Sequence, residues 1–327
     1  MNTIPSIFNE KQINHTVLGG TEKNQIVFFD VDCIILNRSS SVSKNRLFSN
    51  LLSKGFSQII SVGEHSESYS LDLLSRQYPQ IKFIVTQEEN LSSGDFINLG
   101  MAESNSPYVL VITDDLCSED FIFSQKMVDE FIKENCFCVC PKLNSSKLKN
   151  LPVKFSPGVS KSFFSIESEL NVSDKDLTFY SSDFAGFYNR EKFINLGGYD
   201  YTIQNSFWQK LDLFFRSWLW GEKTVISSLF VLNYTSAPPE ENRGADFSYT
   251  RFYVKNLLSV YQNDHAYIPR TSFFAFAATS SCGFSYALKL FNEARRWTEQ
   301  NKYRFKIDAK FLIENWHSFQ MEKNNEA

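Results

Sequence analysis

The chain has 327 residues, of which 43% are hydrophobic, and its formal net charge is −4. This composition suffices for a globular protein with a large core, and the slightly acidic balance, without any run of lysine or arginine, argues against a nucleic-acid partner. The sequence lacks the roughly 18 consecutive apolar residues of a membrane-spanning helix and shows no signal-peptide pattern, so we expect a cytoplasmic protein without a transmembrane segment.

Strand-like and helix-like segments alternate through the first part of the chain. Residues 1–24 are polar and without periodicity, which predicts a loosely attached lead-in. The predicted strands cover residues 25–36, as one long or two short runs, and residues 58–62, 81–85 and 108–113. The first predicted helix runs from near Ser43 to Lys54-Gly55, the second ends at about Tyr78, and the third begins at a Ser93 cap and carries Ala102. This order predicts a layered α/β protein with a parallel sheet.

Six cysteines in a chain of this length do not indicate a disulfide framework, and no Cys-x-x-Cys pair is present. Cys136, Cys138 and Cys140 occupy alternate positions, so on a strand their side chains share one face. A strand spreads such ligands along a line, whereas a metal ion needs ligands that converge. We therefore expect these thiols to act as small buried hydrophobic groups.

Two adjacent carboxylates, Asp114 and Asp115, follow directly after the apolar segment Tyr108–Thr113. Ligands of open α/β sheets bind at the carboxyl ends of the strands, and carboxylate oxygens suit a hard divalent cation. The alternative is that the two acids only cap the segment that follows, because Asp is favoured at such positions.

Motifs in both halves of the domain resemble GT-A glycosyltransferases of the family-2 kind. The first half contributes Cys33-Ile-Ile-Leu-Asn-Arg38, the strand Ile59-Ile-Ser-Val62, and residues 92–102 leading into Val109-Leu-Val-Ile-Thr-Asp-Asp115. The second half contributes residues 184–200, which end in Gly-Gly-Tyr-Asp, then residues 207–216 and Trp220-Gly221. The match covers roughly residues 30–235.

The resemblance implies a GT-A-like, Rossmann-like fold with a mainly parallel sheet flanked by helices. We expect a nucleotide-sugar and acceptor domain over residues 25–235, and a loop plus a helical C-terminal appendage over residues 236–327. The implied activity is transfer of a sugar from a nucleotide-sugar donor to a saccharide, lipid or protein acceptor, assisted by a divalent metal, manganese or magnesium.

On the donor side, the resemblance makes Asp115 the metal ligand, together with Asp114, while Thr113 replaces the first acid of the family's Asp-x-Asp element. Asn37, Arg38, Glu64 and Asp114 are the candidates for contacts to the nucleotide sugar. Arginine can bind diphosphate oxygens through two hydrogen bonds, although Arg38 fits an ordinary solvated loop charge equally well.

On the acceptor side, the chain departs from the family pattern. Gln209 and Lys210 occupy the two positions where the family has acids, one of which is the catalytic base, and only Asp212 remains of that motif. The candidates for catalysis are Asp212, Lys210 and Asp200, with Asp183 as a further possible base and Lys210 as a cation facing phosphate. Asp212 also forms an i,i+4 pair with Arg216, which a surface or semi-buried ion pair explains.

The family's metal-binding histidine after the last sheet strand is also not evident, since that stretch reads Val231-Leu-Asn-Tyr-Thr-Ser236. A catalytically impaired, glycosyltransferase-like binding or scaffold protein is therefore the second hypothesis. A third is a phosphatase of the haloacid dehalogenase type, because Asp30 and Asp32 follow an apolar run as Asp-x-Asp, with Asp114 and Asp115 holding magnesium.

The C-terminal region begins with a loop rich in helix breakers over residues 236–245, in which Arg243 is either a phosphate contact or a solvated charge. Amphipathic helices are expected over residues 247–261, 272–298 and 307–317. Core positions are predicted for their many aromatic side chains, namely Phe252, Tyr253, Phe273, Phe274, Phe276, Phe284, Phe291 and Trp297. An exposed remainder would fit a homo-oligomer contact or an apolar acceptor.

Overall fold

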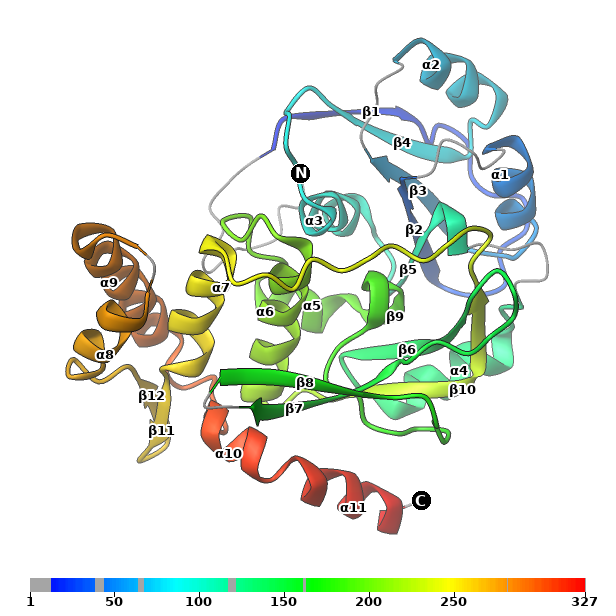
Figure 1. The fold of residues 1–327 in the computed structure, drawn as a ribbon. Coiled ribbons are helices and arrows are strands. Elements are labelled where there is room, and N and C mark those ends of the chain that lie inside the picture. Colours follow the sequence, from blue (N-terminus) through cyan, green and yellow to red (C-terminus); the bar gives the residue numbers. More distant parts are fainter. Residues whose placement is uncertain are drawn as a thin grey trace.

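The computed structural model describes residues 13–38, 44–63, 68–116, 122–160, 163–280 and 282–326. Its centre is an eight-stranded sheet in the order β1-β4-β3-β2-β5-β9-β6-β10 (Figure 1). The strands are β1 His15–Gly19, β2 Val31–Asn37, β3 Gln58–Gly63, β4 Ile81–Thr86, β5 Tyr108–Thr113, β6 Cys138–Asn144, β9 Gly186–Asn189 and β10 Thr224–Asn233. Strands β4, β3, β2 and β5 are parallel neighbours, as are β6 and β10, whereas β1 and β9 run antiparallel to their partners.

Helices cover both faces of this sheet (Figure 1). They are α1 Lys44–Leu52, α2 Ser68–Gln77, α3 Ser93–Glu103, α4 Gln125–Glu134, α5 Arg190–Leu196 and α6 Ser206–Leu219. Two adjacent residues of β9 point to opposite faces of the sheet. Phe187 contacts Phe131 of α4 on one face, and Tyr188 contacts Phe193 of α5 and Phe214 of α6 on the other. Successive side chains of a strand point to opposite faces, so aromatic packing fixes β9 between the two helical layers.

The register of β2 and β5 positions the polar residues that follow them. Leu36 pairs with Thr113, so Asn37 and Asp114 leave the sheet at the same edge. All residues of β2 except Asn37 are buried, as are all of β5 except Tyr108. Continuous burial is expected for parallel strands covered on both faces. The predicted α/β fold with a mainly parallel sheet is thereby confirmed.

Several predicted boundaries were wrong. His15–Gly19 forms β1 on β4, so this part of the expected lead-in is an edge strand and not a loose segment. Strand β2 starts only at Val31, and the cap of α3 is Ser92, whose side chain accepts from the backbone of Asp95 in a capping box.

The three cysteines expected to be buried, Cys136, Cys138 and Cys140, are buried free thiols, which confirms that prediction.

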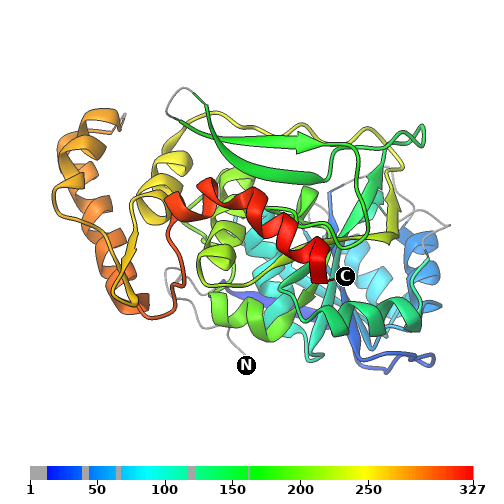
Figure 2. The same cartoon turned by 90° about the horizontal axis from the view of Figure 1, so that it is seen from below.

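The sequence analysis did not anticipate the hairpin of β7, Lys154–Ser160, and β8, Phe163–Glu169, which forms a sheet separate from the described strands of the main one. The last helices, α10 Ala309–Glu314 and α11 Trp316–Glu326, lie beside this hairpin (Figure 2). The indole Nε1 of Trp316 donates to Ser156 Oγ at 3.0 Å and fixes that contact.

The C-terminal region is helical, as predicted, but two expected helices are interrupted. Residues 247–261 form α7 Phe247–Phe252, a π-helical turn over Tyr253–Leu257, and the start of a hairpin of β11 Val260–Gln262 and β12 His265–Tyr267. Residues 272–298 divide into α8 Ser272–Thr279 and α9 Phe284–Asn301. Most of the aromatic residues named above are buried here, but Phe274 and Phe284 are exposed. Among the described residues, no helix has the length and apolar character needed to cross a membrane.

Candidate functional site

Arg38 and Asp115, which follow β2 and β5, are joined by an ion pair at the carboxyl edge of the sheet. The Arg38 guanidinium donates from Nε to Asp115 Oδ2 at 3.1 Å and from Nη2 to Asp115 Oδ1 at 2.9 Å. The backbone N–H of Arg38 donates to Asp114 Oδ1 at 3.3 Å. Three of the predicted donor-site residues are therefore neighbours in space.

Asp183 completes this contact from a turn before β9. Nη1 and Nη2 of Arg38 donate to its two carboxylate oxygens at 2.6 Å each, and the hydroxyl of Tyr234 donates to Oδ2 at 2.7 Å. Asp183 has a φ of 51°, a left-handed conformation that is uncommon for a side-chain-bearing residue. Burial works to lower the pKa of Arg38, but Asp183 and Asp115 together raise it above its ordinary value, so the guanidinium stays charged.

Asp114 is fully buried and forms an ion pair with Lys44 of α1. The Lys44 ammonium also donates to Asn37 Oδ1 at 3.0 Å, and the Asn37 amide donates to Ser61 Oγ at 2.7 Å. These contacts place the side chains of Asn37 and Asp114 in one polar network beneath Lys44. Glu64, the remaining predicted donor contact, lies outside the described residues.

Hydrogen-bond donors of the chain surround Asp114 and Asp115, the two predicted metal ligands. Within the described ranges, no three histidine, cysteine or acidic side chains form a group that could hold a metal ion. Asp115 accepts from Arg38 Nη2 at 2.9 Å and from Thr113 Oγ1 at 2.6 Å. The side chains as they stand therefore do not fit the divalent cation that the resemblance implies.

Lys210, which the resemblance places on the acceptor side, lies near the start of α6. Its side chain is 2% exposed, and its ammonium lies 5.0 Å from the ring centre of Tyr180 and 5.3 Å from that of Phe184. Its partner is Glu241, whose Oε1 is 2.5 Å from Lys210 Nζ and whose Oε2 is 3.0 Å from Arg243 Nη2. Burial would raise the pKa of Glu241, but Lys210 and Arg243 lower it below the ordinary value.

The sequence analysis missed Glu241, which comes from the loop between β10 and α7. The only signal for it was indirect: Lys210 interrupts the apolar stripe of α6, and a lysine that becomes buried is expected to have a nearby carboxylate. Spacing along the sequence does not show which acid of the chain supplies it.

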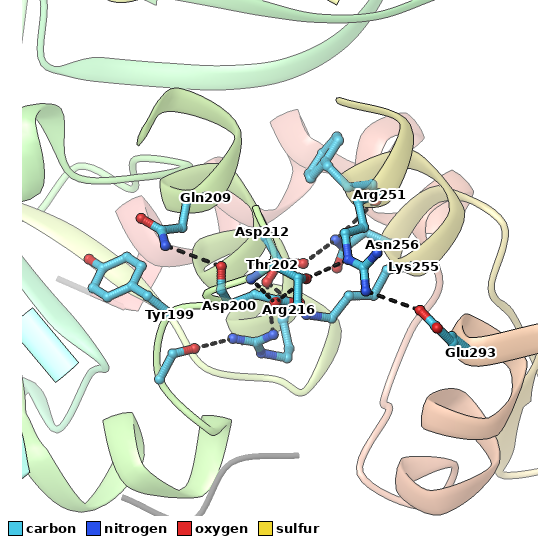
Figure 3. Close-up of polar contacts among 12 residues, drawn as sticks. Tyr199, Asp200, Thr202, Gln209, Asp212, Arg216, Arg251, Lys255, Asn256 and Glu293 are labelled. Atoms are coloured by element: carbon cyan, nitrogen blue, oxygen red, sulfur yellow. Dashed lines mark hydrogen bonds and ion pairs between the residues drawn. The ribbon is translucent and has the colours of Figure 1, made fainter. Parts of the chain in front are cut away.

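Asp200 and Asp212, two of the predicted catalytic residues, belong to a buried charge network (Figure 3). The ammonium of Lys255 lies 2.8 Å from Asp200 Oδ2 and 2.9 Å from Asp212 Oδ2, and Arg216 Nη1 lies 2.9 Å from Asp212 Oδ2. The ion pair of Asp212 and Arg216 is present, but the prediction that it lies at or near the surface was wrong. The exposed fractions of the two side chains are 0% and 3%. Burial works to raise the pKa of Asp212, but Lys255 and Arg216 lower it below its ordinary value.

The phosphatase hypothesis is contradicted by the position of its two acids. Asp32 lies at the amino end of β2, where it accepts from Ser104 Oγ at 2.6 Å and from the backbone N–H of Ser106 at 3.1 Å. Asp114 and Asp115 follow the carboxyl end of the parallel neighbour β5. Asp30 and Asp32 are therefore at the opposite edge of the sheet from the acids that would have held magnesium with them.

No protein-family model matches the sequence, and no curated protein matches it. Among solved structures, the chain is similar to GalNAc-T7 crystallised with UDP, GalNAc and Mn²⁺, with 12% sequence identity and a TM-score of 0.57. That likeness covers 87% of this chain and 56% of the length of GalNAc-T7. TarS residues 1–349 of S. aureus, in complex with UDP-GlcNAc, is a weaker likeness, with 13% identity, 83% and 74% coverage and a TM-score of 0.45. At such identities the likeness concerns the fold, and the chain has the GT-A-like fold of glycosyltransferases.

Proposed function

We propose that the protein transfers a sugar from a nucleotide-sugar donor to a saccharide, lipid or protein acceptor. The observation that carries this proposal is the meeting of Arg38 after β2 with Asp114 and Asp115 after β5, at the carboxyl edge of a GT-A-like sheet. Open α/β sheets bind nucleotides at this edge. The UDP in the GalNAc-T7 structure agrees with a donor of this class.

The donor's diphosphate gains negative charge as the sugar leaves it, so the site needs a group that stabilises this charge. Arg38 and Lys44 supply two cationic side chains, which are 30% and 26% exposed above nearly buried acids. We assign them to the diphosphate, with Asn37 and Asp114 holding Lys44 in place. In this assignment Asn37, Arg38 and Asp114, three of the four predicted donor contacts, remain part of the donor site.

On the acceptor side, we assign the acceptance of the hydroxyl proton to Glu241, because a general base must be reachable by the substrate. The Glu241 side chain is 25% exposed, whereas those of Asp200 and Asp212 are fully buried against Lys255. Lys210 keeps Glu241 ionised and so acts as a positioning residue. In this assignment Asp200 and Asp212 stabilise the fold and do not take part in the reaction.

A second function, that of a non-catalytic binding or scaffold protein, is favoured by one observation. The helix start that carries the family's acids has Gln209 and Lys210, and Asp212, the acid that remains, is neutralised by Lys255 and Arg216. This alternative retains the donor site but lacks a competent base.

Calorimetric titration with UDP, GDP, dTDP and CDP tests the proposal, and hydrolysis or transfer from the matching nucleotide sugar separates the two functions. Tight binding of one nucleotide together with turnover supports the glycosyltransferase. Tight binding without turnover, over a panel of sugars and acceptors, supports the binding protein. Asp115→Asn should weaken binding, whereas Asp129→Asn, on the exposed side of α4, is the matched control. Absence of binding by all four nucleotides overturns both functions.

A further inference from the structure

The acids at the β2–β5 edge have their carboxylate oxygens covered by donors from the chain itself. Asp115 Oδ1 accepts from Thr113 Oγ1 at 2.6 Å and from Arg38 Nη2 at 2.9 Å, and Asp115 Oδ2 accepts from Arg38 Nε at 3.1 Å. A metal ligand needs an oxygen lone pair that points at the ion. In Asp115, both oxygens already face hydrogen-bond donors.

The same holds for Asp183, the acid on the other side of Arg38. Its Oδ1 accepts from Nη1 of Arg38 at 2.6 Å, and its Oδ2 accepts from Nη2 of Arg38 at 2.6 Å and from the Tyr234 hydroxyl at 2.7 Å. One guanidinium thus bridges Asp115 and Asp183, with each carboxylate bound through a pair of N–H groups. Such paired, charge-assisted hydrogen bonds are among the strongest that side chains form.

Asp114 is matched in a similar way, since it pairs with Lys44 and accepts from the backbone N–H of Arg38. A divalent ion entering between Asp115 and Asp183 would have to displace Arg38 and would lie next to the displaced positive charge. Each of the three acids is less exposed than the cation to which it is bound: 6% for Asp115 and 10% for Asp183 against 30% for Arg38, and 0% for Asp114 against 26% for Lys44. The two cations are therefore the most exposed charges of this cluster, whose three acids and two cations give a formal charge of −1.

We infer that Arg38 takes the place of a divalent metal, so that the site binds the nucleoside diphosphate part of its donor without Mn²⁺ or Mg²⁺. The inference rests on the proposed function and deepens it, because it names the group that neutralises the diphosphate. Arg38 and Lys44 present the charge, and Asp115, Asp183 and Asp114 hold the two cations in place. This arrangement departs from the metal-assisted mechanism that the sequence resemblance implies.

The first test titrates the nucleotide panel into the protein in EDTA and again in excess Mn²⁺ or Mg²⁺. We expect the dissociation constant of the preferred nucleotide to agree within about twofold between the two conditions. A loss of affinity of about tenfold or more in EDTA overturns the inference while leaving the proposed function intact. Failure to bind in both conditions overturns the proposed function, and the inference with it. The electron paramagnetic resonance spectrum of Mn²⁺ should show no ion bound to the protein with nucleotide present.

The second test uses Arg38→Ala, with Arg76→Ala, an exposed arginine near the end of α2, as the charge-matched control. In EDTA, Arg38→Ala should weaken nucleotide binding at least about tenfold, and Arg76→Ala should not. Because Arg38→Ala uncovers Asp115 and Asp183, added Mn²⁺ should restore part of the affinity in this variant alone. Unchanged affinity of Arg38→Ala in EDTA refutes the inference. If Arg38→Ala proves unstable, Arg38→Lys takes its place in the test. This variant keeps the charge but not the paired hydrogen bonds, so in EDTA it should bind the nucleotide more weakly than the wild type.

Discussion

Lys255 is the residue whose replacement tests most directly how the C-terminal region is held. It lies in the π-helical turn after α7, is fully buried, and neutralises Asp200 and Asp212 of the GT-A-like domain. With Arg216 included, the network contains two acids and two bases and is neutral. Lys255→Met fills the space of the alkyl chain but removes the cation next to Asp200, which keeps only neutral donors, the backbone N–H and Oγ1 of Thr202.

The expected cost follows from this charge count. Breaking a buried ion pair by removing one partner destabilises a protein by about 3–5 kcal/mol, because the remaining charge stays away from water. Arg216 still neutralises Asp212 at 2.9 Å, so the surplus charge falls on Asp200. We therefore expect Lys255→Met to lower the free energy of unfolding by about 3–5 kcal/mol, and Lys255→Met combined with Asp200→Asn to recover part of that loss.

Urea denaturation followed by circular dichroism measures both values. Lys310→Met is the control, because this lysine is 81% exposed in α10 and its replacement should leave the transition midpoint unchanged. A cost below about 1 kcal/mol for Lys255→Met would refute the network's role. The network's role is equally refuted if the losses from Lys255→Met and Asp200→Asn simply add in the double variant, because additivity means that the two side chains do not interact.

Two further predictions concern the contact of α3 with α6 and the Lys210–Glu241 pair. In Gly94→Ala, the added methyl group would lie 2.4 Å from Gln209 Oε1 and 2.7 Å from Tyr199 Cβ. We therefore expect this variant to lower the free energy of unfolding, measured by urea denaturation, by about 1–3 kcal/mol. An unchanged free energy of unfolding would contradict this packing. The pKa of Glu241 is lowered in the folded state, so its pairing with Lys210 stabilises the protein above the ordinary carboxylate pKa and is lost as the pH falls through the folded value. Glu241→Gln should therefore flatten the fall in stability below about pH 4.5, relative to wild type and to the exposed control Glu314→Gln, and an unchanged slope would refute the pairing.

The first half of the fold was predictable because its signals are local. The apolar runs that became β2, β3, β4 and β5 alternate with helical spacing, and an order of this kind permits few arrangements other than a parallel sheet. Errors remained where a tertiary partner decides the structure. His15–Gly19 is a strand because the edge of β4 is there to pair with it. The antiparallel pairing of β9 with β5 and β6 joins distant parts of the sequence, and no local pattern shows it.

The candidate site was predictable only in part, for a related reason. Asn37 ends β2, and Arg38, Asp114 and Asp115 follow β2 and β5. The parallel register fixes where these strands end, so the proximity of the four residues could be anticipated. The contact of Arg38 with Asp183 spans 145 positions of the sequence, and no periodicity relates the two. Glu241 comes from a loop, whose path depends on the surface beneath it. The roles of these two acids therefore required the structure.

The two positions where α6 departs from the acids of the resembled family, Gln209 and Lys210, have different physical explanations. The Gln209 side chain joins three segments through hydrogen bonds. Its Nε2 donates to Ser92 Oγ at 2.7 Å and to the Asp200 carbonyl at 3.1 Å, while its Oε1 accepts from the Gly94 N–H at 3.1 Å. A glutamate would lack the amide donors for two of these bonds. Lys210, in contrast, retains a carboxylate beside the start of α6 through Glu241. A carboxylate supplied by the loop is available to the proposed reaction, but a buried lysine needs such a partner in a scaffold as well. The measurement of turnover, and not this pairing, therefore separates the two functions.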